Sequence, residues 1–212
     1  MTNLRDKKNI IFDLGNVIID IDLNITYERF RKLGFSEKGD FLSKYKQIGV
    51  FCDFEEGKIN SEQFIQEIKK RMPDEVSSDE IKDAWNALLL NYKTERIETI
   101  LKLKETHNIY VLSNTNELHI DSCENSVPIV GNLRNLFHQV YYSYEMNMSK
   151  PHENIFTALL EHANIKAEET LFLDDGPANI ETAKRLGIES WLIEHPDEWV
   201  PRMNALIQEA GY

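Results

Sequence analysis

Cysteine is scarce in this 212-residue chain, which contains only Cys52 and Cys123. Neither residue has the spacing or the neighbouring ligands of a metal site. We expect both to be buried or half-buried free thiols, although a disulfide between them stays open at this stage. Because disulfides persist mainly in oxidising compartments, the shortage of cysteine favours a cytoplasmic location.

Long hydrophobic runs are absent as well. No apolar segment approaches the roughly 20 residues that a membrane-spanning helix needs. The first residues, Met1 to Asp6, lack the charged-then-apolar order of a signal peptide. These features also favour the cytoplasm and argue against a membrane partner.

Positive charge is in short supply, because 24 lysines and arginines face 36 aspartates and glutamates, for a formal net charge of -12. Such an acidic field repels nucleic acid and anionic membranes, so we expect neither as a partner. An anionic substrate would need local compensation by a cation, a lysine or a helix N-terminus. Nothing in the sequence separates a monomer from a homodimer.

Apolar runs alternate with helical patterns over much of the chain. Short strands are predicted at residues 10–13, 109–112, 140–143, 170–173 and 190–193. Helices are predicted between the later strands, at about residues 94–103, 154–163 and 178–186. This alternation predicts an α/β fold with a Rossmann-like parallel sheet and helices on both faces.

Residues 24–93 interrupt the alternation. Helical periodicity without a strand signal runs through this block, from a first helix after Asn24 to an apolar stripe at Leu88–Leu90. We therefore expect a core of residues 1–23 and 94–212 and an inserted all-helical cap of residues 24–93. The expected interior of this cap comprises Tyr27, Phe30, Trp85 and, on a helix capped by Ser36, Phe41.

Asp13 ends the first apolar strand and is followed by a turn that contains Gly15. A buried strand that ends in a carboxylate places it at the sheet edge where open α/β sheets bind ligands. A carboxylate there can attack phosphorus and form an aspartyl-phosphate, which splits one difficult step into two. The plainer alternative is an aspartate that caps the turn, and Asp13 alone would favour it.

Asp174 and Asp175 directly follow another apolar strand. Two adjacent carboxylates at such a place are costly unless a cation or hydrogen bonds compensate them. Oxygen ligands of this kind suit Mg²⁺, which makes the pair a candidate metal site. A solvated acidic turn is an equally good interpretation of the pair alone.

Ser113, Asn114 and Lys150 complete the set. Ser113 and Asn114 follow a predicted strand, where a hydroxyl and backbone N–H groups can hold phosphate oxygens. Lys150 precedes a predicted helix and can neutralise phosphate and carboxylate charge. Each residue is ordinary by itself, because serine and asparagine commonly cap helices and a lone lysine is usually on the surface. Together with Asp13 and the acidic pair, they indicate a magnesium-assisted phosphoryl-transfer site.

Four segments resemble, in the right order, the motifs of the haloacid dehalogenase superfamily of aspartate-nucleophile phosphatases. They are Phe12-Asp13-Leu14-Gly15-Asn16-Val17, Leu112-Ser113-Asn114, Ser149-Lys150-Pro151, and Leu173-Asp174-Asp175 with Asn179. Each motif is short, but four together are specific, and the resemblance covers nearly the whole chain. It implies catalytic roles for Asp13, Ser113 and Lys150, with Asp13 as nucleophile. Ser113, Asn114 and Lys150 would bind the phosphate.

The resemblance also implies a magnesium cofactor. Asp13, the Gly15 carbonyl and Asp175 would be ligands, with Asp174 at the metal site to orient the magnesium shell. The implied activity is hydrolysis of a small phosphorylated metabolite. The nearest likeness is to sugar-phosphate phosphatases of the glucose-1-phosphate type, which also carry an Asp-Leu-Gly-Asn-Val motif.

The helical block falls where one branch of the superfamily inserts a helical cap, and Phe54–Ile59 matches a recurring cap loop. Such a cap would close over Asp13, exclude water and shape the substrate pocket. Glu56, Lys58 and Trp85 are candidate pocket residues of the cap.

One position departs from the superfamily pattern. Most of its phosphatases have a second aspartate two residues after the nucleophile, as general acid and base, and that position is Gly15 here. Loss of a general acid typically costs about 10²–10⁴ in rate. The cost is smaller for an acidic leaving group, such as a sugar anomeric oxygen or an acyl phosphate. Asp20 or Asp22 could substitute, although edge residues of a strand are the plainer interpretation.

Three other functions compete with the phosphatase. A receiver-like signalling domain would carry its acidic pair at the first strand, whereas this pair follows a late strand. A magnesium-independent dehalogenase would not need Asp174 and Asp175. A non-catalytic relative that binds a metabolite or a partner is favoured only by Gly15, and the joint presence of Asp13, Lys150 and the acidic pair counts against it.

Overall fold

The computed structural model describes residues 2–35 and 49–211. The helix predicted from Ser36, with Phe41, lies outside the described residues. Cys52 and Cys123 are both free thiols. No helix in the described part of the chain is long and apolar enough to cross a membrane.

Five parallel strands form the central sheet, in the order β5-β4-β1-β6-β7. These strands are β1 (Asn9–Phe12), β4 (Asn108–Ser113), β5 (Gln139–Tyr142), β6 (Thr170–Asp174) and β7 (Glu189–Leu192). Phe12 in the central strand pairs with Val111 on one side and Leu173 on the other. The predicted parallel sheet is confirmed, and its register brings the carboxyl ends of β1, β4 and β6 to one edge.

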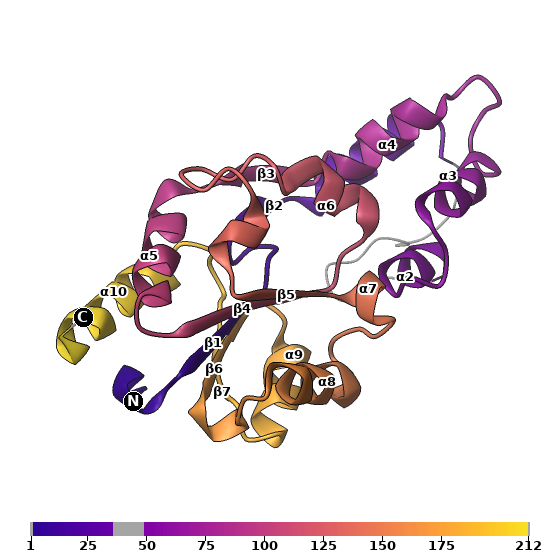
Figure 1. Ribbon diagram of the computed structural model, residues 1–212. Coiled ribbons are helices and arrows are strands. Elements are labelled where there is room, and N and C mark those ends of the chain that lie inside the picture. Colours follow the sequence, from indigo (N-terminus) through magenta and orange to yellow (C-terminus); the bar gives the residue numbers. More distant parts are fainter. Residues whose placement is uncertain (1, 36–48, 212) are drawn as a thin grey trace.

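Helices cover both faces of this sheet (Figure 1). One face carries α5 (Thr94–Lys104) and α10 (Trp199–Ala210), and the other carries α8 (Glu153–Ala163) and α9 (Pro177–Arg185). The two-residue period of a strand explains this division. Ile10 and Phe12 join the buried cluster with Trp199, whereas Ile11 joins the cluster on the opposite face. Both faces of β1 are therefore apolar, as a central parallel strand requires.

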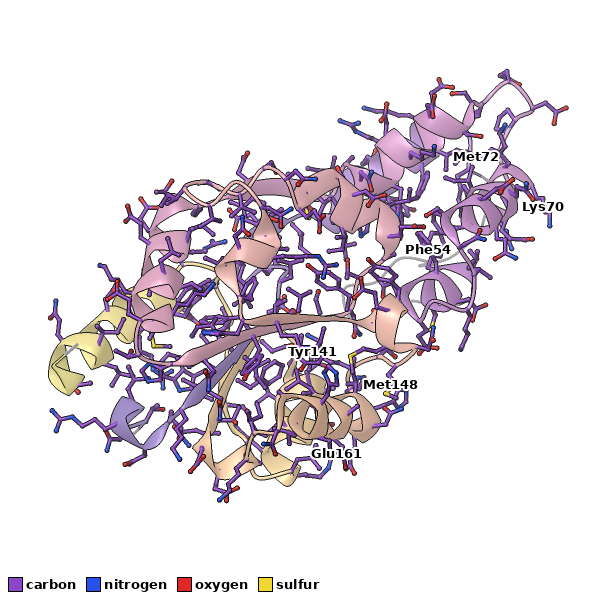
Figure 2. All side chains as sticks on the ribbon, viewed as in Figure 1. Phe54, Lys70, Met72, Tyr141, Met148 and Glu161 are labelled. Atoms are coloured by element: carbon purple, nitrogen blue, oxygen red, sulfur yellow. The ribbon has the colours of Figure 1, made fainter. Side chains whose placement is uncertain are left out.

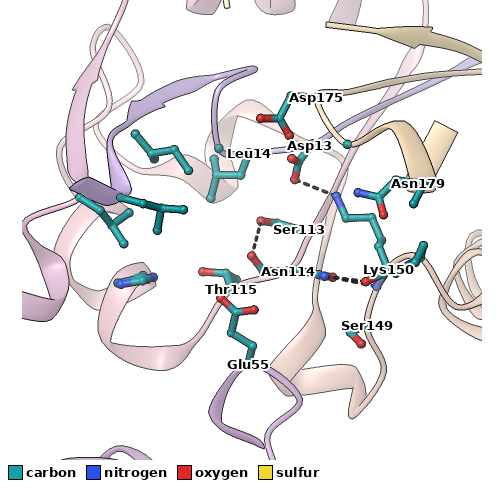
Figure 3. Close-up of a pocket in the computed structure, with 18 of the residues that line it drawn as sticks. Asp13, Leu14, Glu55, Ser113, Asn114, Thr115, Ser149, Lys150, Asp175 and Asn179 are labelled. Atoms are coloured by element: carbon teal, nitrogen blue, oxygen red, sulfur yellow. Dashed lines mark hydrogen bonds and ion pairs between the residues drawn. The ribbon is translucent and has the colours of Figure 1, made fainter. Parts of the chain in front are cut away.

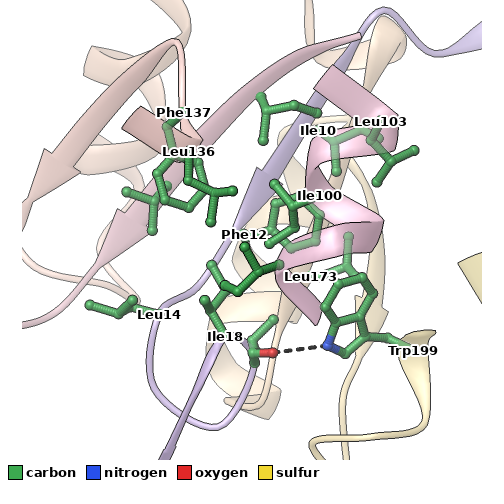
Figure 4. Packing of buried hydrophobic residues seen from close by; sticks show 14 of the residues in the cluster. Ile10, Phe12, Leu14, Ile18, Ile100, Leu103, Leu136, Phe137, Leu173 and Trp199 are labelled. Atoms are coloured by element: carbon green, nitrogen blue, oxygen red, sulfur yellow. Dashed lines mark hydrogen bonds between the residues drawn. The ribbon is translucent and has the colours of Figure 1, made fainter. Parts of the chain in front are cut away.

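Trp199 joins the first helical face to the turn after β1. Its ring centroid lies 5.3 Å from that of Phe12, and its Nε1 donates a hydrogen bond of 2.9 Å to the Val17 carbonyl (Figure 4). Burial of an indole favours such a bond, because an unpaired N–H would be costly. The contact holds the segment that follows Asp13 against the core.

A second group of helices lies beyond one end of the sheet (Figure 1). It comprises α1 (Leu23–Lys32), α2 (Val50–Glu55), α3 (Ser61–Lys69) and α4 (Ser78–Asn86). Capping boxes at Asn60 and Ser77 begin α3 and α4. Phe30 and Trp85 are fully buried in the cluster between these helices, as predicted. Tyr27 is 39% exposed, so its expected place in the interior is wrong: it lies on the outer face of α1.

Side chains fill the space between these elements (Figure 2). Tyr141 and Met148 pack between the sheet and the helical layer of α8, whereas Glu161 points away from that layer into solvent. In the second group, Phe54 stacks on Phe64 with ring centroids 4.4 Å apart. Each group of helices therefore has its own packed interior.

The segment Leu89–Tyr92 is a strand, β3, and not the helical stripe expected there. It pairs antiparallel with β2 (Ile19–Ile21), forming a two-stranded ribbon between the sheet and the second group of helices. A short apolar run cannot be assigned to helix or strand by periodicity alone, which explains the error. The remaining elements are α6 (Glu117–Cys123), α7 (Ser143–Met146) and short 3-10 helices at Leu4–Asp6, Leu133–Leu136 and Ala167–Glu169.

Candidate active site

A cavity of about 730 Å³ lies between the carboxyl edge of the sheet and the second group of helices. Figure 3 shows its polar floor, where Asp13, Ser113 and Asp175 converge with Lys150. Asp13 follows β1 directly, and its N–H donates to the Leu173 carbonyl at 2.8 Å. The strand register therefore places residues distant in sequence around one cavity.

Lys150 is the buried centre of this floor. Its Nζ donates to Asp13 Oδ1 at 2.8 Å, to Asp174 Oδ2 at 2.6 Å and to the Leu112 carbonyl at 2.8 Å. These contacts use all three N–H groups of the ammonium. Only 4% of the lysine is exposed, so the two carboxylates compensate a buried charge.

Asn114 positions Lys150 through its main chain. The Asn114 amide donates to the Lys150 carbonyl and accepts from the Lys150 N–H, both at 2.8 Å. Its side chain therefore supports the lysine. Direct contact between this side chain and phosphate stays a prediction.

Asp174 is fully buried, and both of its oxygens have partners. Oδ2 accepts from Lys150, while Oδ1 accepts from the Gly176 N–H at 2.7 Å and from Asn179 at 2.8 Å. A Cβ at Gly176 would approach Asn179 Nδ2 to 2.7 Å, so a side chain there would displace the Asn179 amide that donates to Asp174. Because both oxygens of Asp174 accept hydrogen bonds within the protein, this carboxylate holds the lysine in place.

Asp175 is less buried and lies on the side of the cavity nearest the turn after β1 (Figure 3). Asn16 donates to its Oδ2 at 3.0 Å. One oxygen each from Asp13, Asp174 and Asp175 lie within 4.8 Å of one another. Three carboxylates against one lysine leave an excess of negative charge, and this oxygen donor set fits Mg²⁺.

Electrostatics reflect that excess. Burial, together with the neighbouring Asp174 and Asp175, raises the pKa of Asp13 to about 7, although Lys150 acts to lower it. Burial acts to lower the pKa of Lys150, but its ion pairs with Asp13 and Asp174 outweigh that effect and raise it. The lysine is therefore a permanent cation. A further cation beside Asp13 would favour its ionised form.

Ser113 and Gly15, the other predicted site residues, both line the cavity. Ser113 is 3% exposed, and its hydroxyl contacts only the Asn114 carbonyl, at 3.4 Å, among the residues described. Asp20 and Asp22 do not line it. Asp20 pairs with Arg96 at 2.8 Å, and Asp22 caps α1 by accepting from the Asn24 N–H at 2.9 Å.

Among the candidate residues of the cap, only Glu56 lines the cavity. Trp85 is buried between the helices, and Lys58 points outward and forms a 2.6 Å ion pair with Glu56. Sequence reasoning missed Glu55, the neighbour of Glu56, which also lines the cavity (Figure 3). Its signal was present in the segment Phe54–Ile59, which was interpreted only as a loop.

Known proteins resemble this chain over most of its length. The sequence profile of the haloacid dehalogenase-like hydrolase family matches residues 10–193. A D-ribitol-5-phosphate phosphatase from Bacteroides thetaiotaomicron is 32% identical over 202 residues, which cover 94% of this chain and 98% of that protein.

Solved structures agree with this likeness. A haloacid dehalogenase family enzyme from Bacteroides thetaiotaomicron was solved as an aspartate-to-alanine variant in complex with magnesium and inorganic phosphate. It is 34% identical with a TM-score of 0.87, covering 91% of this chain and 96% of that one. A HAD-like family hydrolase from Porphyromonas gingivalis is 32% identical with a TM-score of 0.87, covering 95% and 98%. The profile spans the residues from β1 to the end of β7, and the four motifs meet at one cavity. The chain therefore belongs to the haloacid dehalogenase-like hydrolase family, as those motifs predicted.

Proposed function

We propose that this protein is a magnesium-dependent phosphatase that hydrolyses a sugar or polyol monophosphate through an aspartyl-phosphate on Asp13. The observation that carries the proposal is the cluster of Asp13, Asp174 and Asp175 around the buried ammonium of Lys150, beneath a cavity. A cluster with excess negative charge is suited to bind a cation, and the bound cation would offset the repulsion between the carboxylates and a phosphate. The relatives described above support the magnesium ion and the phosphorylated substrate.

The ligands of the magnesium ion would be Asp13, Asp175 and the Gly15 carbonyl. Gly15 lines the cavity, and no backbone donor among the described residues contacts its carbonyl oxygen. Asp174 would act indirectly, because its oxygens are already used by Lys150, Gly176 and Asn179. The bound ion would supply positive charge against the phosphoryl oxygens and hold Asp13 ionised.

Asp13 attacks phosphorus, and the bond to the leaving oxygen breaks. Ser113 and Lys150 both line the cavity: the Ser113 hydroxyl donates to a phosphoryl oxygen, and the Lys150 ammonium supplies positive charge as negative charge moves onto the phosphoryl oxygens. Water then attacks the aspartyl-phosphate, which returns the Asp13 carboxylate and releases inorganic phosphate. Asn114 keeps Lys150 in place during both steps.

The substrate is a single phosphate ester with an uncharged, hydroxyl-rich remainder. Glu56 lines the cavity at the end of α2, where a second phosphate would be repelled and hydroxyls would find an acceptor. Sequence reasoning favoured an acidic leaving group of the glucose-1-phosphate type. The relative that is named for D-ribitol 5-phosphate adds the phosphate ester of a primary alcohol to the candidates. We propose residues 24–93 as the cap and the remainder as the core.

A phosphate-release assay with a substrate panel tests this function. D-ribitol 5-phosphate, glucose 1-phosphate, an acyl phosphate and a nucleotide would be compared, each with Mg²⁺ and with a chelator. We expect magnesium-dependent release from sugar or polyol phosphates and none from Asp13→Asn. Substantial turnover by Asp13→Asn would overturn the nucleophile assignment.

The second candidate function is a non-catalytic metabolite-binding or partner-binding protein, and Gly15 is the observation that favours it. Calorimetry distinguishes the two. Binding of Mg²⁺ and inorganic phosphate by a folded protein that hydrolyses no member of the panel would support the binding protein. A cytoplasmic location and a monomeric or homodimeric state stay predictions.

A further inference from the structure

Gly15 lies against Ile21 at the place of the missing aspartate. A Cβ at Gly15 would lie 3.0 Å from Ile21 Cδ1, so a side chain there would require Ile21 to shift. Asp20 and Asp22, the nearest acids along the chain, are held by Arg96 and by the start of α1. A proton donor for the leaving group must therefore come from another wall of the cavity.

Glu55 lies on that other wall. It is the last residue of α2, and Figure 3 shows its side chain extending from the helix toward Thr115 and the end of β4. We propose that Glu55 is the general acid and base of this enzyme, a role that the cap supplies in place of the residue absent at Gly15. This proposal rests on the proposed phosphatase function.

The backbone of Glu55 is fixed to the phosphate side of the cavity by Ser143. The Ser143 hydroxyl donates to the Glu55 carbonyl at 2.6 Å and accepts from the Thr115 N–H at 2.9 Å. Ser143 is fully buried, and Thr115 lies two residues after Ser113. One buried side chain therefore sets the distance between the cap glutamate and the loop proposed to bind phosphate.

The next two residues strengthen this attachment. Asn147 donates to the Glu56 carbonyl at 3.1 Å. Gly57 has a φ of +67°, and a Cβ there would lie 2.1 Å from the Tyr144 carbonyl oxygen. Only glycine allows the cap chain to approach α7 so closely. The end of α2 is thus held at a defined position over the cavity.

Glu56, the other cap carboxylate that lines the cavity, is directed elsewhere, because it accepts from Ser149 at 2.6 Å and pairs with Lys58. His119 of α6 also lines the cavity, but its ring nitrogens face the Trp85 carbonyl and the Asn116 amide. Glu55 is the cap carboxylate that extends toward Thr115 (Figure 3).

The proton balance of the reaction assigns two steps to Glu55. As Asp13 attacks phosphorus and the bond to the leaving oxygen breaks, the protonated Glu55 carboxyl gives its proton to that oxygen, and a neutral alcohol leaves. The Glu55 carboxylate then takes a proton from the water that attacks the aspartyl-phosphate. The phosphorus–Asp13 bond breaks, inorganic phosphate leaves, and Glu55 is again protonated. Such help is needed most when the leaving group is a simple alcohol.

Glu55→Gln tests the proposal, with Asp53→Asn as the matched control. Asp53 lies on the same helix and undergoes the same change from a carboxyl to an amide, but it does not line the cavity. With D-ribitol 5-phosphate, or the best substrate found for the wild type, we expect kcat of Glu55→Gln to fall about 10²–10⁴-fold. Asp53→Asn is expected to retain wild-type kcat.

Rapid mixing with p-nitrophenyl phosphate separates a chemical role from a structural one. Its leaving group needs no proton, so Glu55→Gln should release a burst of p-nitrophenol equal to the enzyme concentration. Slow turnover should follow, because water attack still lacks a base. Loss of the burst together with turnover would mean that Glu55 only shapes the cap, and unchanged kcat would also overturn the proposal. An inactive wild type would instead refute the phosphatase function itself.

Discussion

Lys150 Nζ lies 2.6 Å from Asp174 Oδ2, and both side chains are almost completely buried. The same ammonium contacts Asp13 at 2.8 Å, so one lysine compensates two carboxylates. This arrangement determines the stability of the site as well as its chemistry.

Lys150→Met should strongly destabilise the metal-free protein, because Asp13 and Asp174 would lose their buried partner. Removing one member of a buried ion pair typically costs about 3–5 kcal/mol in the free energy of unfolding. Lys93→Met is the control, since Lys93 is 41% exposed and pairs with the exposed Asp197. Urea unfolding should show that this control loses less than about 1 kcal/mol in the free energy of unfolding. Equal losses in the two variants would contradict the predicted role of Lys150.

Asp13→Asn should stabilise the metal-free protein at pH 8. Burial raises the pKa of Asp13 to about 7 in the folded protein, whereas an unfolded aspartate titrates near 3.9. Its ionisation therefore destabilises the fold as pH rises from about 4 to 7, by at most about 4 kcal/mol. The gain in the variant should shrink toward pH 4, where the wild-type carboxyl is protonated. Thermal unfolding at both pH values measures it, and a gain independent of pH would disprove the assignment.

His119 should make the protein sensitive to acid. Burial lowers the pKa of His119 to about 4, so between about pH 6.5 and 4 the unfolded chain binds a proton that the folded chain does not. Stability falls across this window by up to about 3 kcal/mol. The stability difference between wild type and His119→Gln should therefore narrow as pH falls from 7 to 4.

The control for that measurement is Gln208→Ala, which changes an exposed side chain that does not titrate. The stability difference between this variant and the wild type should stay constant over the same range. If the His119→Gln difference is equally constant, the protonation of His119 does not couple to folding.

Ser143→Ala should loosen the cap edge. It leaves the buried Thr115 N–H without the Ser143 hydroxyl and removes the bond to the Glu55 carbonyl. An unsatisfied buried donor costs about 1–3 kcal/mol. We expect the free energy of unfolding to fall by that amount. We also expect kcat to decrease, because the Ser143 hydroxyl would no longer fix the Glu55 main chain. Ser126→Ala, which removes an exposed hydroxyl, should change neither, and equal effects in both would rule out this attachment.

Much of the site followed from local signals in the sequence. Asp13, Ser113 and Asp174 each directly follow or end an apolar run, so their place at strand ends could be read from neighbours in the chain. Parallel strands bring such ends to one edge, which predicts their convergence without knowledge of any contact. The sheet and its flanking helices followed from the same periodicity.

Other features depended on tertiary contacts. The short run at Leu89–Tyr92 became a strand because β2 lies beside it, since its own periodicity suits either structure. Asp20 was a candidate substitute for the missing general acid, but it forms an ion pair with Arg96, 76 positions away in the chain, and does not line the cavity. Tyr27 fitted a helical stripe, but the packing of α1 left it exposed.

Local patterns in the sequence place the candidate site residues at one end of the sheet, because strand ends and apolar runs are local properties. How the charges of these residues are compensated depends on contacts between distant elements. Asn114 holds the Lys150 main chain, and Ser143 holds Glu55 from 88 residues away. Hydrogen bonds over such separations depend on how distant elements pack, and no local pattern encodes that packing.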